Sequence, residues 1–134
     1  MIVGIGIDLV EVERLAKALR SPHGPQFEER VFTADEKADC AARGGRGRIE
    51  CLAARFAAKE ACLKALGTGF AHGMWIRDVG ITANRWGRPE VIWSERGRRR
   101  RDELGAGEGH VTLTDEAGLV IAVAVLMRRA DGAA

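Results

Sequence analysis

The first ten residues alternate between branched apolar side chains and small or polar ones. Every second position is apolar, at Val3, Ile5, Ile7 and Leu9. The positions between them hold two glycines and a carboxylate, at Gly4, Gly6 and Asp8. Because successive side chains of a strand point to opposite faces, this pattern predicts a strand over 2–9 with one apolar face and one bare face. The glycines would let another element pack closely on the bare face, into which Asp8 projects from the strand's end.

Short helical segments are predicted after this strand. They cover 11–19, a helical turn over 25–31, and 33–42. Ser21-Pro22 ends the first, because the residue before a proline avoids the helical conformation. Thr33 and Glu36 have the spacing of a capping box, in which each side chain bonds the other residue's backbone N–H. The glycine- and arginine-rich stretch 44–47 predicts a flexible loop before the next helix.

A long helix is predicted from about Ile49 to Leu66. One face of this helix forms a stripe of residues that recur at helical spacing: Leu52, Phe56, Leu63 and Gly67. Glu60 lies on the same stripe, and a carboxylate removed from water is costly unless it is paired or binds a metal. Lys59 and Lys64 flank it, and Lys64 is its i+4 neighbour. Gly67 stands where a helix commonly ends, with Gly69 prolonging the turn.

The second half of the chain has strand patterns. The predicted strands cover 75–83, 89–93, 109–114 and 119–127, with a helix over 94–104 between the second and third. Ser94 is placed to cap that helix, Gly87 to Pro89 mark a turn, and 115–118 mark a tight hairpin. A strand, then helices, then a run of strands indicates the α+β class.

Length and composition limit the class of protein to which the chain can belong. A chain of 134 residues with 46% hydrophobic content is expected to form one domain over 1–134. We find neither a long apolar run nor a leader pattern, so we expect a cytoplasmic protein that does not insert into membranes. The net charge of +2 does not indicate nucleic-acid binding. The arginine run 96–101 is interpreted as a solvated helix face rather than a nucleic-acid site.

The three cysteines are expected to be reduced. Cys40, Cys51 and Cys62 are odd in number and lack CxxC spacing, which supports neither a zinc site nor a disulfide framework. Cys51 and Cys62 are predicted to share one helix, about 16 Å apart, and so could not bridge each other. We therefore expect all three to be small apolar fillers.

Asp8 and Glu60 are the main candidates for chemistry. If the long helix packs on the glycine face of the first strand, the two carboxylates come together. Two carboxylates on rigid elements suit Mg²⁺, which keeps several waters and takes phosphate oxygens from its substrate. The alternative is structural, with Asp8 capping the strand end and Glu60 pairing with Lys64. The spacing alone does not decide between them.

Two motifs together make the chain resemble a known family. GIGIDLVEVERL, Gly4 to Leu15, is followed about forty residues later by RFAAKEACLKALGTG, Arg55 to Gly69. This combination resembles the holo-acyl-carrier-protein synthases of the 4′-phosphopantetheinyl transferase superfamily. The similarity continues through the Gly87 to Pro89 turn and the final segment HVTLTDEAGLVIAVAVL. The resemblance implies a long central helix packed on a small antiparallel sheet, and transfer of phosphopantetheine from coenzyme A to a serine of apo acyl carrier protein.

The resemblance also implies site residues. Asp8 and Glu60 match the family's magnesium ligands and, with Lys64, its catalytic residues. The positions that match coenzyme A contacts are Arg55, Phe56, Lys59, Lys64, Gly67, Gly87 and Pro89. The helix that receives the acidic helix of the carrier carries Arg14, Lys17 and Arg20. A homotrimer with active sites at subunit interfaces is implied as well.

Some questions stay open at this stage. The acceptor of the serine proton is either a water on the metal ion or Glu60. Asp115 stands where many relatives have His, so a phosphate-binding role there is in doubt, and the residue is expected to shape the hairpin. The carrier belongs to fatty-acid, polyketide or peptide synthesis. There are two alternative functions: a binding subunit with impaired catalysis, and a nucleic-acid-binding protein. The presence of Asp8, Glu60, Lys59 and Lys64 argues against the impaired subunit.

Overall fold

The computed structural model describes residues 1–67 and 73–130 and has an α+β fold. Three antiparallel strands form the main sheet in the order β1 (Ile2–Glu11), β5 (Leu119–Arg128) and β4 (Ala106–Glu116). A second, two-stranded sheet pairs β2 (Val79–Ala83) with β3 (Pro89–Trp93). The predicted class is therefore confirmed, with an antiparallel sheet built mainly from the two ends of the chain.

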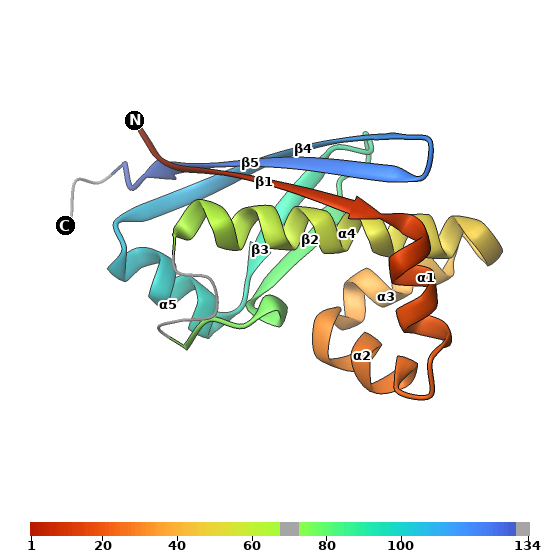
Figure 1. The fold of residues 1–134 in the computed structure, drawn as a ribbon. Helices are drawn as coiled ribbons and strands as arrows, with labels where there is room; N and C mark the ends of the chain where they lie inside the picture. Colours follow the sequence, from red (N-terminus) through yellow and green to blue (C-terminus); the bar gives the residue numbers. More distant parts are fainter. Residues whose placement is uncertain (68–72, 131–134) are drawn as a thin grey trace.

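Helices cover one face of the main sheet (Figure 1). They are α1 (Val12–Arg20), α2 (Gly24–Val31), α3 (Ala34–Ala41), α4 (Gly45–Leu66), the 3₁₀ turn η2 (Ile76–Asp78) and α5 (Glu95–Glu103). The long helix α4 runs beneath the sheet and packs on β1 and β5, with α1 to α3 gathered near one of its ends (Figure 1). Most of the core lies between this helix and the strands, so α4 is covered on nearly every side.

The glycine face of β1 lies directly against α4, as the alternation predicted. A Cβ built on Gly4 would meet the backbone oxygen of Ala65 at 1.9 Å, and one on Gly6 would meet that of Ala61 at the same distance. No side chain fits there, because real Cβ atoms do not approach a carbonyl oxygen so closely. This close approach places the end of β1, with Asp8, beside the second half of α4.

The apolar face of β1 is exposed on the opposite side of the sheet. Ile5, Ile7 and Leu9 are 63%, 59% and 58% exposed, although branched apolar side chains are normally buried. Neighbouring positions on β5, Leu119 and Ile121, are exposed too. Exposed apolar side chains gathered on one face of a sheet are typical of a contact with another molecule.

Helix α4 begins four residues earlier than predicted. The expected loop over 44–47 is mostly its first turn, and the chain reverses at Gly44 and Gly45, whose φ angles are 67° and 53°. An ion pair of 3.4 Å between Arg46 and Glu50, one turn apart, favours the helical conformation there. Gly67 ends the helix with φ 78°, as predicted, and Gly69 lies outside the described residues.

Among the helices of the described ranges, none is long and apolar enough to span a bilayer.

Two other element boundaries differ from the sequence prediction. The strand expected to start at Trp75 begins only at Val79, because Asp78 accepts a hydrogen bond from the Trp75 backbone N–H and closes a 3₁₀ turn. Strand β4 begins at Ala106 rather than Gly109, with a register shift between these two residues. The capping box of Thr33 and Glu36 and the Ser94 cap of α5 are confirmed.

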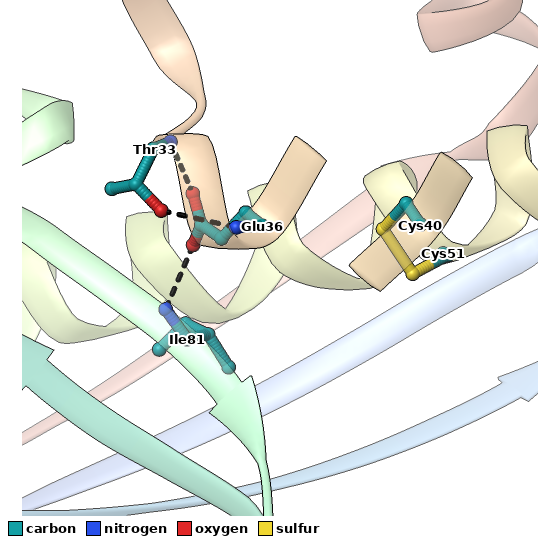
Figure 2. Close-up of a disulfide and its surroundings, with 5 residues drawn as sticks. All are labelled: Thr33, Glu36, Cys40, Cys51 and Ile81. Carbon is teal, nitrogen blue, oxygen red and sulfur yellow. Dashed lines mark hydrogen bonds between the residues drawn. A yellow bond between two sulfur atoms is a disulfide. The ribbon is translucent and has the colours of Figure 1, made fainter. Parts of the chain in front are cut away.

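Two of the three cysteines are joined, so the expectation of reduced fillers is wrong for them. Cys40 of α3 and Cys51 of α4 form a disulfide, with Cα atoms 5.4 Å apart (Figure 2). Sequence reasoning tested only the pair on one helix, Cys51 and Cys62. The turn at Gly44 and Gly45 folds α3 back onto α4 and creates the other pair. Cys62 stays free and buried, and burial raises the pKa of its thiol to about 12.

Candidate functional site

A cleft between β1, α1 and α4 contains both predicted carboxylates. Asp8 and Glu60 line it together with Arg14 and the rings of Phe27 and Phe56. Lys64, one turn after Glu60, donates from Nζ to the backbone oxygen of Ile7 at 3.0 Å and to Oδ1 of Asp8 at 2.9 Å. The structural alternative paired Lys64 with Glu60, whereas in the structure Lys64 forms its ion pair with Asp8, across the strand–helix contact.

The environment of Glu60 disfavours its ionised form. Burial of the side chain raises the pKa of Glu60, the negative charge of Asp8 raises it further, and the positive charge of Lys64 lowers it. Asp8 already has a cation in contact, whereas no ion pair of Glu60 is found among residues 1–67 and 73–130. The pair thus holds more negative charge than its immediate surroundings neutralise.

The two carboxylates fit a magnesium ion of the kind that works on phosphates. Mg²⁺ is usually held by one or two carboxylates, and waters and substrate phosphate oxygens complete its coordination. In the described parts of the chain no group of three or more His, Cys, Asp or Glu side chains is placed to hold a metal. Asp8 and Glu60 therefore suit an ion that arrives with its substrate better than a closed structural site.

Lys59 does not line this cleft, and its assignment to the coenzyme A contacts stays a prediction. Its side chain is fully buried, and Nζ lies 2.7 Å from Oε1 of Glu36. The second oxygen of Glu36 accepts from the Ile81 backbone N–H at 2.7 Å, as Figure 2 shows. Lys59 faces α3 because it lies about 100° round the helix from Glu60. Sequence reasoning found Glu36 only as a helix cap and missed this network.

Arg55 is buried on the same side of α4 as Lys59. Its side chain is 5% exposed, and Nε and Nη2 have no hydrogen-bond acceptor within the described ranges. Burial lowers the pKa of Arg55 and the nearby positive charge of Arg43 adds to this, while Asp39 and Glu36 oppose it. Two guanidinium nitrogens without acceptors are unusual in a buried side chain. Phe56, the next residue, is half-buried with its ring 6.3 Å from that of Phe27.

The glycine–proline turn predicted at the nucleotide pocket lines a different hollow. Pro89 contributes to a cleft between β3 and β4 with Arg88 and His110, and Gly87 lies at the adjoining turn with φ 82°. None of the residues lining this hollow lines the carboxylate cleft. Gly67, at the end of α4, is exposed. Within one chain the proposed coenzyme A residues are therefore distributed over separate places.

The predicted basic edge is present on α1. Arg14, Lys17 and Arg20 are all exposed, and Arg20 pairs with Glu13 at 3.1 Å. Arg14 also lines the carboxylate cleft, so this edge continues into the candidate site. Asp115 lies at the start of the β4–β5 turn and lines a shallow hollow with Arg46 and Glu50.

Comparisons with known proteins identify the family of the chain. Residues 4–124 match the family model "ACPS: 4′-phosphopantetheinyl transferase superfamily". The chain is 45% identical to a holo-[acyl-carrier-protein] synthase of Magnetococcus marinus, over 94% of this chain and 93% of that one. It is 40% identical to one of Brucella ovis, over 94% and 95% of the two chains.

Solved structures show the same fold. The Neisseria meningitidis holo-[acyl-carrier-protein] synthase superposes with a TM-score of 0.86 at 32% identity, covering 96% of this chain and 100% of that one. A Bacillus anthracis synthase in complex with CoA (3′,5′-ADP) superposes with 0.78 at 32% identity, covering 96% and 99%. The chain thus belongs to the 4′-phosphopantetheinyl transferase superfamily and groups within it with the holo-[acyl-carrier-protein] synthases.

Proposed function

We propose that this protein transfers 4′-phosphopantetheine from coenzyme A to a serine of apo acyl carrier protein and releases adenosine 3′,5′-bisphosphate. The observation that carries the proposal is the cleft lined by Asp8 and Glu60, with Lys64 paired to Asp8, in a chain of this family. The Bacillus anthracis relative was solved with CoA (3′,5′-ADP), and one from Helicobacter pylori with coenzyme A. The carriers of fatty-acid or polyketide synthesis are the substrates we favour.

The chain's own residues supply charge and position in this scheme. Lys64 holds an ammonium beside Asp8, where it would bind phosphate oxygens and stabilise charge on the departing group. Its hydrogen bonds to Ile7 and Asp8 fix that ammonium in place. Asp8 and Glu60 are the residues that would hold Mg²⁺, which supplies positive charge beside the phosphates. Phe27 and Phe56 give the cleft an apolar wall suited to the pantetheine arm.

The carrier protein would dock on α1. The exposed cations Arg14, Lys17 and Arg20 form a basic edge that ends at the carboxylate cleft. An acidic carrier surface bound there would bring its serine toward Asp8 and Glu60. Charge complementarity of this kind increases the association rate and orients the partner.

We also propose a homotrimer that joins active-site parts from neighbouring chains, in the cytoplasm. Its support is the exposed apolar surface formed by Ile5, Ile7 and Leu9 with Leu119 and Ile121. The separation of the Pro89 hollow from the carboxylate cleft is a second support, because a neighbouring chain could place its own Pro89 hollow beside this cleft, where coenzyme A would contact both.

A mass-shift assay tests the proposal. Incubation with coenzyme A, Mg²⁺ and a panel of apo carriers should add one phosphopantetheine to at least one carrier. Asp8→Asn and Glu60→Gln should each lower the rate by about 100-fold or more. Glu95→Gln is the matched control, because Glu95 is an exposed carboxylate in the first turn of α5. Full activity of either cleft variant would contradict the assignment, and Mg²⁺-dependent binding of coenzyme A without turnover would favour a binding subunit.

A further inference from the structure

Three successive turns of α4 present their side chains to α3. Cys51, Arg55 and Lys59 recur at intervals of four residues and so lie on one stripe of the helix. At one end of the stripe Cys51 is bonded to Cys40 of α3. At the other end Lys59 pairs with Glu36 of the same helix at 2.7 Å. Helix α3 is therefore fastened to α4 at two points, on either side of Arg55.

The two fastenings differ in chemistry. Glu36 makes several bonds at once. Its side chain accepts from the Ile81 N–H and closes the capping box with Thr33 (Figure 2), and it also contacts Lys59. The Cys40 end of α3 has the disulfide as its covalent tie and continues into the Gly44 and Gly45 turn. A change in thiol redox state alters the second fastening alone.

Arg55 lies between these two points, and its guanidinium is not fully hydrogen-bonded. It is 5% exposed, and its Nε and Nη2 find no acceptor in the described part of the chain. Asp39 of α3 acts on it only through its charge. Because a buried guanidinium gains strongly from a bidentate anion, the covered Arg55 is an anion-binding group that an anion from solution does not reach.

We propose that Cys40 and Cys51 form a redox latch: the disulfide holds the end of α3 over Arg55, and reduction lets this end open so that an anionic ligand reaches the guanidinium. The ligand in question is a phosphate-bearing one. Its identification with the nucleotide part of coenzyme A rests on the proposed function, whereas the latch itself does not.

The redox step is a thiol–disulfide exchange with a small thiol such as glutathione. A thiolate of the reductant attacks one sulfur of the Cys40–Cys51 bond and releases the other as a thiolate, which takes a proton. A second reductant thiolate attacks the mixed disulfide and releases the second cysteine. The cysteine pair gains two electrons and two protons, and the reductant leaves as its own disulfide. Oxidation is the reverse reaction.

Thiol mapping by mass spectrometry tests whether the latch exists. Protein purified without reductant, unfolded and alkylated should carry the label only on Cys62, and protein treated with dithiothreitol should carry it on all three cysteines. The melting temperature should be lower by about 5 °C or more in the reduced form, because the closed loop no longer limits the unfolded chain. Labelling of Cys40 and Cys51 in the unreduced protein at every glutathione ratio tested would overturn the proposal.

Guanidinium modification tests what the latch controls. After removal of the reductant, 1,2-cyclohexanedione should modify Arg55 about fivefold faster or more in the reduced protein than in the oxidised protein. Exposed Arg98 is the internal reference and should react equally in both. In the Cys40→Ala variant, Arg55 should react at the fast rate with or without prior reduction. In the Cys62→Ala variant, the Arg55 rate should respond to reduction as it does in the original protein. Equal Arg55 rates in the two forms of the unsubstituted protein would overturn the latch, whether or not the variants fold.

Calorimetry with adenosine 3′,5′-bisphosphate links the latch to ligand binding. We expect about threefold tighter binding or more by the reduced form, because the ligand no longer has to displace α3. Equal affinity in the two forms would overturn this coupling. Absence of binding in both forms would count against the proposed function, and the cysteine and Arg55 measurements would still decide the latch.

Discussion

Lys64 of α4 and Asp8 of β1 are joined by a hydrogen-bonded ion pair of 2.9 Å across the contact between helix and strand. The lysine side chain is about half exposed, at 53%, whereas that of Asp8 is 14% exposed. The ammonium is thus held by a sheltered carboxylate, while about half of the lysine side chain stays exposed to solvent. A cation held in this way is available to a phosphate without having to leave its partner.

The first prediction concerns this lysine. Lys64→Met should lower kcat for phosphopantetheine transfer by about 100-fold or more, because no other cation in the described part of the chain contacts Asp8. The fold should survive, since an exposed ion pair contributes little to stability. Single-turnover kinetics on an apo carrier would measure the effect. Lys37→Met is the control, because Lys37 pairs with exposed Glu29, and an equal loss there would argue against a role specific to Lys64.

The second prediction is that Glu60→Gln stabilises the metal-free protein at pH 7 while abolishing transfer. Burial and the charge of Asp8 raise the pKa of Glu60, so the fold favours the protonated form, which Gln resembles. The stability that Glu60 contributes is present below the ordinary value of 4.5 and is lost as the pH rises through the higher pKa of the folded state. The gain should be about 1 kcal/mol.

Urea unfolding in a chelator, from pH 4 upward, would measure this gain. The two proteins should have similar stability at the acid end and diverge as the pH rises. Added Mg²⁺ should stabilise the original protein and leave Glu60→Gln almost unchanged, because ligand binding to the folded state shifts the unfolding equilibrium. A variant less stable than the original at pH 7 would show that Glu60 is a structural residue.

The third prediction concerns the contact between β1 and α4. Gly6→Ala should destabilise the protein by about 3 kcal/mol or prevent folding, because its Cβ would meet the Ala61 oxygen at 1.9 Å. Gly47→Ala is a matched control in the first turn of α4, where the nearest atom would be the Arg43 Cβ at 3.4 Å. That change should be neutral or stabilising by about 0.5 kcal/mol. Denaturant unfolding of both variants would decide whether the close approach is real.

The fourth prediction concerns assembly. Ile7→Glu should convert an oligomer into monomers, because a charge on the exposed apolar face of β1 cannot be buried against another subunit without a large penalty. Transfer should be lost together with the oligomer, since the Pro89 hollow and the carboxylate cleft would no longer meet. Light scattering after size exclusion would measure the mass. Leu104→Glu, a similar change at the exposed apolar residue that follows α5, should leave both properties unaltered.

Local sequence patterns predicted most helices and strands, and they predicted that Asp8 and Glu60 lie in one place. The alternation of 2–9 predicted both the strand and its glycine face, since the period of two and the absence of a Cβ are properties of the residues themselves. The Thr33 and Glu36 box and the Gly67 cap were equally local. Asp8 and Glu60 were expected to meet once α4 was placed on the glycine face, and they do line one cleft.

Other features depended on which helix faces which. The stripe of α4 that carries Lys59 was taken to be available to phosphate, but α3 folds back over it and Glu36 pairs with the lysine. The same packing brings Cys40 to Cys51 and covers Arg55. A turn at Gly44 and Gly45 sets this arrangement, and glycine permits many turn directions. The sequence by itself therefore determined the elements, the glycine contact and the carboxylate pair, while only the tertiary structure decided which charges of α4 face solvent and which are buried.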